Sequence, residues 1–253
     1  MFPAIRGLQT FRNATDQHYG QNIIMPQIFD NIDNPLLKAI SEAMGLSKRS
    51  DFCVGYFNLR GWRLIDSLVE QWPGGEGNCC RLLVGMQAPP TEELRNALSL
   101  SSTPVLMDNN TALRMRRALA EEFRNQLCLG APTDDDERGL RRLAAQIKAQ
   151  KVVIKLFLKH PLHAKLYLLF RPDPINPIIG YLGSSNLTLA GLSKQGELNV
   201  DVLDHDATQK LAKWFEDRWT DRWCIDISKE LVEIIEKSWA RETPIPPYHI
   251  YLK

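Results

Sequence analysis

Long hydrophobic runs are absent from this chain of 253 residues. No apolar stretch approaches the roughly 20 residues that a membrane-spanning helix needs. The first residues, Met-Phe-Pro-Ala-Ile-Arg, lack the basic segment followed by an apolar core that marks a secretory signal. We therefore expect a cytoplasmic protein with no membrane partner.

Cysteine is also scarce, and its spacing excludes two classes of small stabilised domain. The five cysteines are odd in number and form no Cys-x-x-Cys pair, which argues against a disulfide framework and against structural zinc. Cys79 and Cys80 adjoin the apolar run 82–84, so we expect small buried residues there and not reactive thiols. His160 and His163 have an odd spacing that separates them on a strand, so no metal is expected.

Motifs for nucleotide hydrolysis and internal repeats are missing as well. The chain contains no Gly-x-x-x-x-Gly-Lys-[Ser/Thr] segment, so we expect no ATP site and no cofactor within these residues. With 44% hydrophobic residues the chain can bury a large core, which fits one α/β domain better than two small ones.

Hydrophobic periodicity predicts alternating strands and helices. The arrangement indicates an α/β fold with a mixed β-sheet flanked by helices on both faces. Three prolines between residues 171 and 177 predict a loop between two strands. The expected strands are 51–57, 81–85, 152–158, 164–170, 178–183 and 197–203, and the expected helices are 35–45, 61–71, 91–99, 111–128, 135–150, 207–222 and 228–240.

Positive charge is concentrated in one part of a chain whose net charge is only +1. Between residues 111 and 159 there are eleven basic and six acidic residues, a net charge of +5. Two interpretations stay open: a pair of solvated helices with charges placed to suit their dipoles, or a nucleic-acid footprint. A second pattern, the apolar stripe Leu211, Phe215, Trp219 and Trp223, has helical spacing and favours core packing over base stacking.

The residues with the clearest chemistry begin at His163-Ala164-Lys165. Side chains alternate along a strand, so His163, Lys165 and Tyr167 share one face and can meet one phosphate. A neutral imidazole can attack phosphorus and hold the phosphoryl group covalently. A lysine ammonium can neutralise the nonbridging oxygens.

Two further segments complete the pattern. Gly183-Ser184-Ser185-Asn186 predicts a turn before a short helix at 187–192, and the Asn186 amide can donate to the same phosphate oxygens. Taken alone, Asn186 is equally compatible with a helix cap. Glu197 begins a strand whose polar face also carries Asn199 and Asp201, and its carboxylate can orient the histidine.

This ordered set resembles the phospholipase D superfamily, and most of all its nuclease branch, over roughly residues 20–245. The resemblance implies that His163 is the nucleophile, that Lys165 and Asn186 bind phosphate, and that Glu197 supports the histidine. It also implies that Ser184 and Ser185 contact the substrate. Many members carry an aspartate where this chain has Phe170. That departure argues against a lipid-headgroup enzyme more than against catalysis.

Superfamily members usually supply two histidines from two copies of the motif, the second as the acid that protonates the leaving group. This chain has a single His-x-Lys, because its other histidines (His18, His160, His205, His249) stand outside one. We therefore expect a homodimer that shares one active site across a two-fold axis.

The sequence thus predicts a phospholipase D-like nuclease domain over residues 1–242 and a proline-rich linker over 243–253. The linker resembles the junction to an ATP-dependent helicase region, which implies such a C-terminal partner and a role in restriction or defence. The expected activity is metal-independent cleavage of DNA through a covalent phosphohistidine. The alternative is a catalytically silent DNA-binding or dimerisation module of a helicase.

Overall fold

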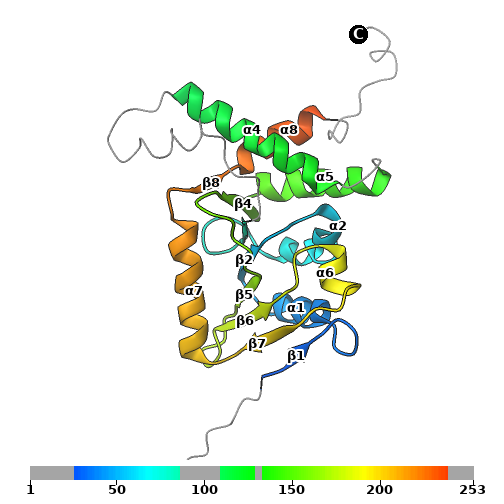
Figure 1. Cartoon of the computed structure of the whole chain (residues 1–253), viewed down its shortest axis with the longest axis vertical. Coiled ribbons are helices and arrows are strands. Elements are labelled where there is room, and N and C mark those ends of the chain that lie inside the picture. Colours follow the sequence, from blue (N-terminus) through cyan, green and yellow to red (C-terminus); the bar gives the residue numbers. More distant parts are fainter. Residues whose placement is uncertain (1–25, 86–108, 129–132, 239–253) are drawn as a thin grey trace, which may run out of the picture.

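The computed structural model describes residues 26–85, 109–128 and 133–238, which form one mixed eight-stranded sheet with helices on both faces (Figure 1). The strand order is β1-β7-β6-β5-β2-β3-β4-β8. The predicted α/β class is therefore confirmed. The strands are β1 (Ile28–Phe29), β2 (Arg49–Val54), β3 (Cys80–Val84), β4 (Val152–Phe157), β5 (Leu166–Phe170), β6 (Ile178–Gly183), β7 (Asn199–Val202) and β8 (Cys224–Asp226).

Helices occupy both sides of this sheet, but unequally. They are α1 (Leu36–Gly45), α2 (Leu59–Trp62), the 3-10 helix η1 (Asp66–Gln71), α4 (Asn109–Leu127), α5 (Asp134–Lys148), α6 (Leu189–Ser193), α7 (His205–Trp219) and α8 (Ser228–Lys237). One core cluster contains apolar side chains from most of these helices, whereas α7 alone covers the second cluster on the opposite face. None of these helices is long and apolar enough to cross a bilayer.

Sheet register determines which loops meet. The central strands β2, β3 and β4 are parallel, and β5 runs antiparallel to β2 with Cys53 opposite Leu166. Leu166 in turn lies opposite Leu182, and Gly183 lies opposite Asn199. The segment before β5, the turn after β6 and the segment before β7 therefore emerge at one end of the sheet, beside the end of β2.

Alternating burial confirms the expected faces of β5. Leu166, Leu168 and Phe170 pack in the cluster under α7, whereas Tyr167 and Leu169 pack in the larger cluster on the other face. The predicted stripe belongs to the core only in part. Phe215 and Trp219 on α7 are buried, and their rings stack with centroids 5.6 Å apart. Trp223 lies beyond the end of α7 and packs against the other cluster.

Several boundaries differ from the sequence prediction. The helix expected over 61–71 is divided into α2 and η1, and bonds of the 3-10 type, such as Ile65 N–H to the Trp62 carbonyl, continue the chain between them. Strands β1 and β8 have only two and three residues, too few for a periodic signal. The predicted helix 91–99 and the linker 243–253 lie outside the described residues, so the domain boundary at 242 stays a prediction.

Candidate active site

His163 and Lys165 lie in the segment immediately before β5. The sequence had predicted that they lie on the strand itself. His163 is exposed, whereas Lys165 is only 4% exposed. The Lys165 ammonium lies 2.7 Å from His163 Nε2 and also donates to the His163 carbonyl at 3.0 Å. The preceding residue, Leu162, is buried and donates its N–H to the Gly85 carbonyl at the end of β3. A fixed backbone therefore presents the imidazole to solvent with the cation beneath it.

The electrostatic setting of Lys165 is unusual for a lysine. Burial lowers its pKa, and the negative charge of Glu197 opposes that shift. Its hydrogen-bond partners are an imidazole nitrogen and a carbonyl, and neither is a carboxylate. No carboxylate contacts this ammonium directly among the residues that the structure describes. The cation is therefore available to an incoming anion.

Asn186 is held at the same end of the sheet by the chain that leaves β2. Its Oδ1 accepts the backbone N–H of Tyr56 at 2.9 Å. The cap of helix α6 is Thr188, whose hydroxyl accepts the Gly191 N–H at 3.0 Å. The helix-cap interpretation of Asn186 is therefore wrong, and its amide NH₂ has no hydrogen-bond acceptor among the described residues.

Ser185 positions the turn, because it is completely buried. Its N–H donates to Asn199 Oδ1 at 3.2 Å, and its hydroxyl accepts from Asn199 Nδ2 at 2.9 Å. Its carbonyl accepts the Tyr167 hydroxyl at 2.8 Å. Its side chain does not reach solvent, and the expectation that Ser185 contacts substrate stays a prediction.

Ser184 and Glu197 form a pair on the open side of the turn. The exposed Ser184 hydroxyl donates to the Glu197 carboxylate, and the Leu198 N–H bonds back to that hydroxyl at 2.9 Å. The expected support of His163 by Glu197 is therefore not seen as a direct hydrogen bond. The carboxylate acts on Lys165 through its charge instead.

Gly183 permits the close approach of β6 and β7 on which the site depends. A Cβ at this position would lie 2.2 Å from the Leu198 carbonyl oxygen and 2.4 Å from Asn199 Oδ1. Any larger residue would push apart the two strands that hold Ser185 and Asn199 together. The first glycine of the motif is thus required by packing.

The sequence prediction did not assign three residues to the site that the structure places there. They are Tyr56, Asn199 and Tyr167. The Tyr56 ring lies edge-on to the His163 ring, with centroids 6.3 Å apart. Asn199 and Tyr167 had been placed on polar faces, and that alternation was the only available signal for them. Nothing in the local sequence around Tyr56 distinguishes it from a buried strand residue.

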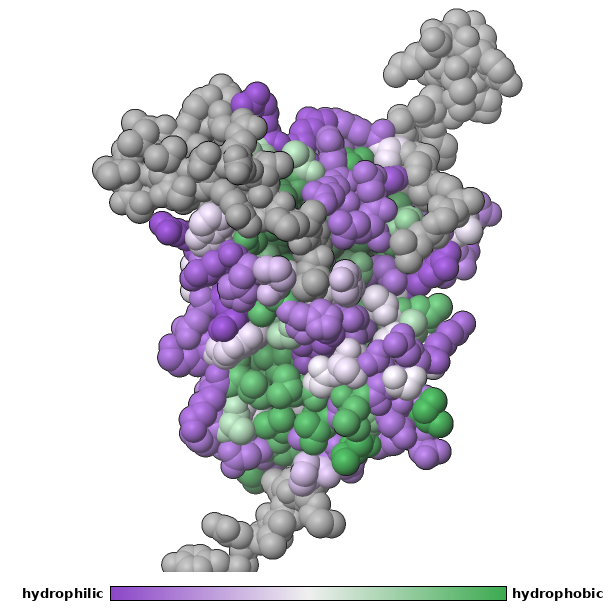
Figure 2. All heavy atoms as spheres, in the orientation of Figure 1, coloured by the Kyte–Doolittle hydropathy of each residue, from purple (hydrophilic) through white to green (hydrophobic). Residues whose placement is uncertain are grey.

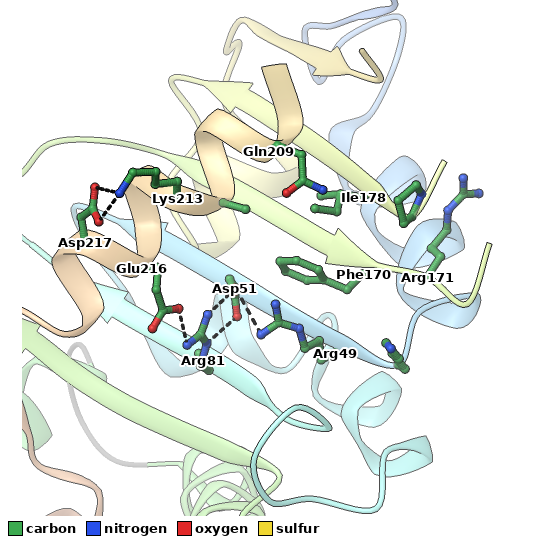
Figure 3. A pocket seen from close by; sticks show the side chains of 13 residues that line it. Arg49, Asp51, Arg81, Phe170, Arg171, Ile178, Gln209, Lys213, Glu216 and Asp217 are labelled. Carbon is green, nitrogen blue, oxygen red and sulfur yellow. Dashed lines mark hydrogen bonds and ion pairs between the residues drawn. The ribbon is translucent and has the colours of Figure 1, made fainter. Parts of the chain in front are cut away.

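Toward the opposite end of the sheet lies a cavity of about 590 Å³ between α7 and strands β2, β3 and β5 (Figure 3). Arg81 binds Asp51 through two hydrogen bonds of 2.7 Å and also pairs with Glu216 on α7 at 2.8 Å. The Arg49 guanidinium covers the ring of Phe170, 3.6 Å from its centroid. The position of the missing family aspartate therefore lies in this region, at the far end of β5 from His163.

Ion pairs neutralise most of the basic segment 111–159. Lys151 pairs with Glu70, Lys159 with Asp221, and Lys148 with Glu236, so the partners often lie outside the segment. This pairing favours the interpretation of these residues as a solvated surface whose positive charges are compensated by carboxylates within the protein. The cations of the segment with a carboxylate partner are Arg117, Arg138, Arg141, Arg142, Lys148, Lys151 and Lys159.

Comparisons with solved structures find remote relatives. Nuc, a phospholipase D family member from Salmonella typhimurium, is 11% identical with a TM-score of 0.45, covering 80% of this chain and 97% of that chain. NucT from Helicobacter pylori gives the same identity and TM-score, with 80% and 98% covered. A phosphatidylserine synthase from Haemophilus influenzae is 14% identical with a TM-score of 0.46, covering 85% of this chain but 45% of its own.

These structural similarities are too distant to support any conclusion about activity. None of the curated proteins matches the chain. The family model described as "Cardiolipin synthase, PLD-like domain", however, matches residues 36–219, more than half of the chain and all of the site. The fold, the His-x-Lys pair and this match together show that the chain belongs to the phospholipase D superfamily, through its cardiolipin synthase PLD-like domain family.

Proposed function

We propose that this protein is a metal-independent phosphodiesterase that cleaves DNA through a covalent phosphohistidine on His163. The observation that carries the proposal is the 2.7 Å contact between the exposed imidazole Nε2 of His163 and the buried ammonium of Lys165. An exposed nucleophile thus has beside it a cation to which no carboxylate of the described residues is directly bonded. A phosphodiester needs both.

The first chemical step begins when a phosphate displaces the imidazole as acceptor of the Lys165 ammonium. The Nε2 lone pair of His163 is then free to attack phosphorus. The P–N bond forms, and the bond to the leaving oxygen breaks and carries its electron pair away. In the second step a water oxygen attacks phosphorus and gives its proton to the group that had protonated the leaving oxygen. The P–N bond breaks, its electron pair returns to Nε2, and His163 is regenerated.

Asn186 and Glu197 support these steps in different ways. Because Asn186 Oδ1 is engaged by the Tyr56 N–H, its NH₂ group can donate to a nonbridging oxygen as charge develops there. The Glu197 charge opposes the effect of burial on Lys165 and helps to keep that side chain protonated. We assign Ser184 to orienting the Glu197 carboxylate and, being exposed, to contacting the substrate.

The leaving oxygen requires a proton, and we assign this role to His163 of a second copy across a two-fold axis. A surface beside the site supports such a dimer. Ile28, Leu182 and Leu198 are 61%, 40% and 65% exposed, and the last two flank the Ser184–Glu197 pair. Figure 2 shows hydrophobic residues gathered in the lower half of the molecule, where β6 and β7 lie in Figure 1. Burying this surface would stabilise the dimer.

The deciding experiment incubates the purified protein with labelled single- and double-stranded DNA in excess chelator. We expect cleavage, and an alkaline quench should preserve a protein–DNA adduct that acid destroys, as a phosphoramidate requires. Cleavage that appears only with added magnesium would overturn the mechanism. Binding of DNA without cleavage under any condition would support the alternative, a silent module of a helicase. Phosphatidylglycerol vesicles serve as a lipid control.

The shared site has a separate test. Sedimentation should show a dimer, and mixing inactive His163→Ala protein with wild type should lower total activity as subunits exchange. A strictly monomeric species that still cleaves DNA would exclude the shared site. The link to a helicase and a role in restriction or defence stay part of this proposal, and co-purification of a helicase with this chain would support the link.

A further inference from the structure

Tyr56 combines features that pure packing does not explain. Its side chain is 48% exposed although the two residues that follow it are anchored. Phe57 is buried and stacks on Phe123 with centroids 5.8 Å apart, and Asn58 caps helix α2. The Tyr56 N–H is itself bound by Asn186. A large aromatic ring is thus held on a fixed backbone without being buried.

The position of the ring relates it to the nucleophile. The Tyr56 and His163 rings meet edge-on at 77°, with centroids 6.3 Å apart. The Tyr56 ring therefore lies beside the imidazole while about half of its side chain stays exposed. A phosphate at His163 brings a neighbouring group of the same ligand within reach of this exposed aromatic ring.

We propose that Tyr56 stacks on the nucleobase next to the scissile phosphate and so makes a single strand the preferred substrate of this site. This inference rests on the proposed function. Every base offers an aromatic face, so stacking tolerates any sequence. In a duplex each base is already stacked on its neighbours and paired, and the ring gains this contact only with an unpaired strand.

The test measures binding in the His163→Ala background, so that it does not depend on cleavage. Fluorescence anisotropy compares a single-stranded oligonucleotide, the same oligonucleotide with abasic sites, and its duplex at one salt concentration. Tyr56→Ala should weaken single-strand affinity about tenfold. Tyr56→Phe, which keeps the ring and loses the hydroxyl, should restore it. Ile175→Ala removes another exposed apolar side chain, in the loop between β5 and β6 away from the site, and is the matched control.

Abasic DNA provides the double-mutant comparison. On abasic DNA the wild-type and Tyr56→Ala proteins should bind with the same affinity, because no base is present for the Tyr56 ring to stack on. An equal loss on normal and abasic strands would overturn the inference, as would a dimer that dissociates when Tyr56 is replaced. If the Tyr56 dependence holds while the wild-type protein cleaves no DNA, the proposed activity fails and the stacking role stands. If cleavage holds and Tyr56→Ala binds normally, only the stacking role fails.

Discussion

The two ends of the sheet use similar residues for opposite purposes. Around Arg81, each guanidinium is matched by carboxylates: Asp51, only 1% exposed, receives Arg81 and lies 3.6 Å from Arg49, and Glu216 adds a second partner. At the other end, Lys165 is 4% exposed, and within the described part of the chain its hydrogen-bond partners both belong to His163.

The difference separates a structural cation from one available to a ligand. A buried charge is stable only when it is paired, and the Arg81 network satisfies that requirement while it joins α7 to the sheet. Lys165 meets it only in part, through the distant charge of Glu197, and its lowered pKa is the sign of that deficit. An anionic ligand would supply the missing partner. The candidate site is therefore distinguished by a buried cation without a directly bonded carboxylate, and not by positive charge as such.

The largest expected effect is the loss of catalysis in His163→Ala. The P–N intermediate cannot form without the imidazole, so the cleavage rate should fall by about 10⁴-fold. His163 is exposed, so the free energy of unfolding and the affinity for DNA should change little. Single-turnover kinetics with circular dichroism as the folding control measures this. Cleavage at the wild-type rate would contradict the nucleophile assignment.

Asp51→Asn tests the structural end of the comparison. It leaves Arg49 and Arg81 with one carboxylate fewer in a buried setting, so the free energy of unfolding should drop by about 3 kcal/mol. Urea denaturation measures the loss. The cleavage rate per folded molecule should stay the same, because the change lies far from His163. A stable variant with impaired cleavage would show that the two ends are not independent.

The pH dependence of cleavage tests the state of Lys165. The ammonium is the form that binds phosphate, and burial makes it lose its proton at a lower pH than an ordinary lysine. We therefore expect kcat/KM to fall on the alkaline side earlier than an exposed lysine would allow. Glu197→Gln removes the charge that favours the ammonium and should move this fall to still lower pH. The guanidinium of Lys165→Arg does not lose its proton in this pH range, so the alkaline fall of kcat/KM should disappear in that variant. An alkaline limb unchanged in both variants would assign it to another group.

The smallest effect is expected for Lys213→Ala at the rim of the cavity beside Arg81. Lys213 pairs with Asp217 one helical turn away, and their side chains are 77% and 58% exposed. Such a pair contributes at most about 0.5 kcal/mol. Thermal unfolding of Lys213→Ala and Asp51→Asn under the same conditions compares the loss of stability in the two variants. A loss as large as that of Asp51→Asn would mean that exposure does not distinguish the two ion pairs.

Much of the fold could be read from periodicity. The six predicted strands are present because each carries enough alternating or continuous apolar residues to indicate a buried face. The break between α2 and η1 could not be read, because it depends on a distant contact. A Cβ at Gly61 would lie 2.5 Å from the Thr188 Cα, so the helix passes closely over the turn that follows Asn186.

The sequence by itself determined the candidate set, because His163, Lys165, Asn186 and Glu197 stand in an order and spacing that local patterns reveal. Only the tertiary structure decided which groups each one contacts. Ser185 faces inward because Asn199, fourteen residues later, takes both its N–H and its hydroxyl, and Glu197 meets Ser184 and not His163. These outcomes depend on the register between β6 and β7. Register arises from contacts between residues distant in the chain, and a local pattern carries no record of them.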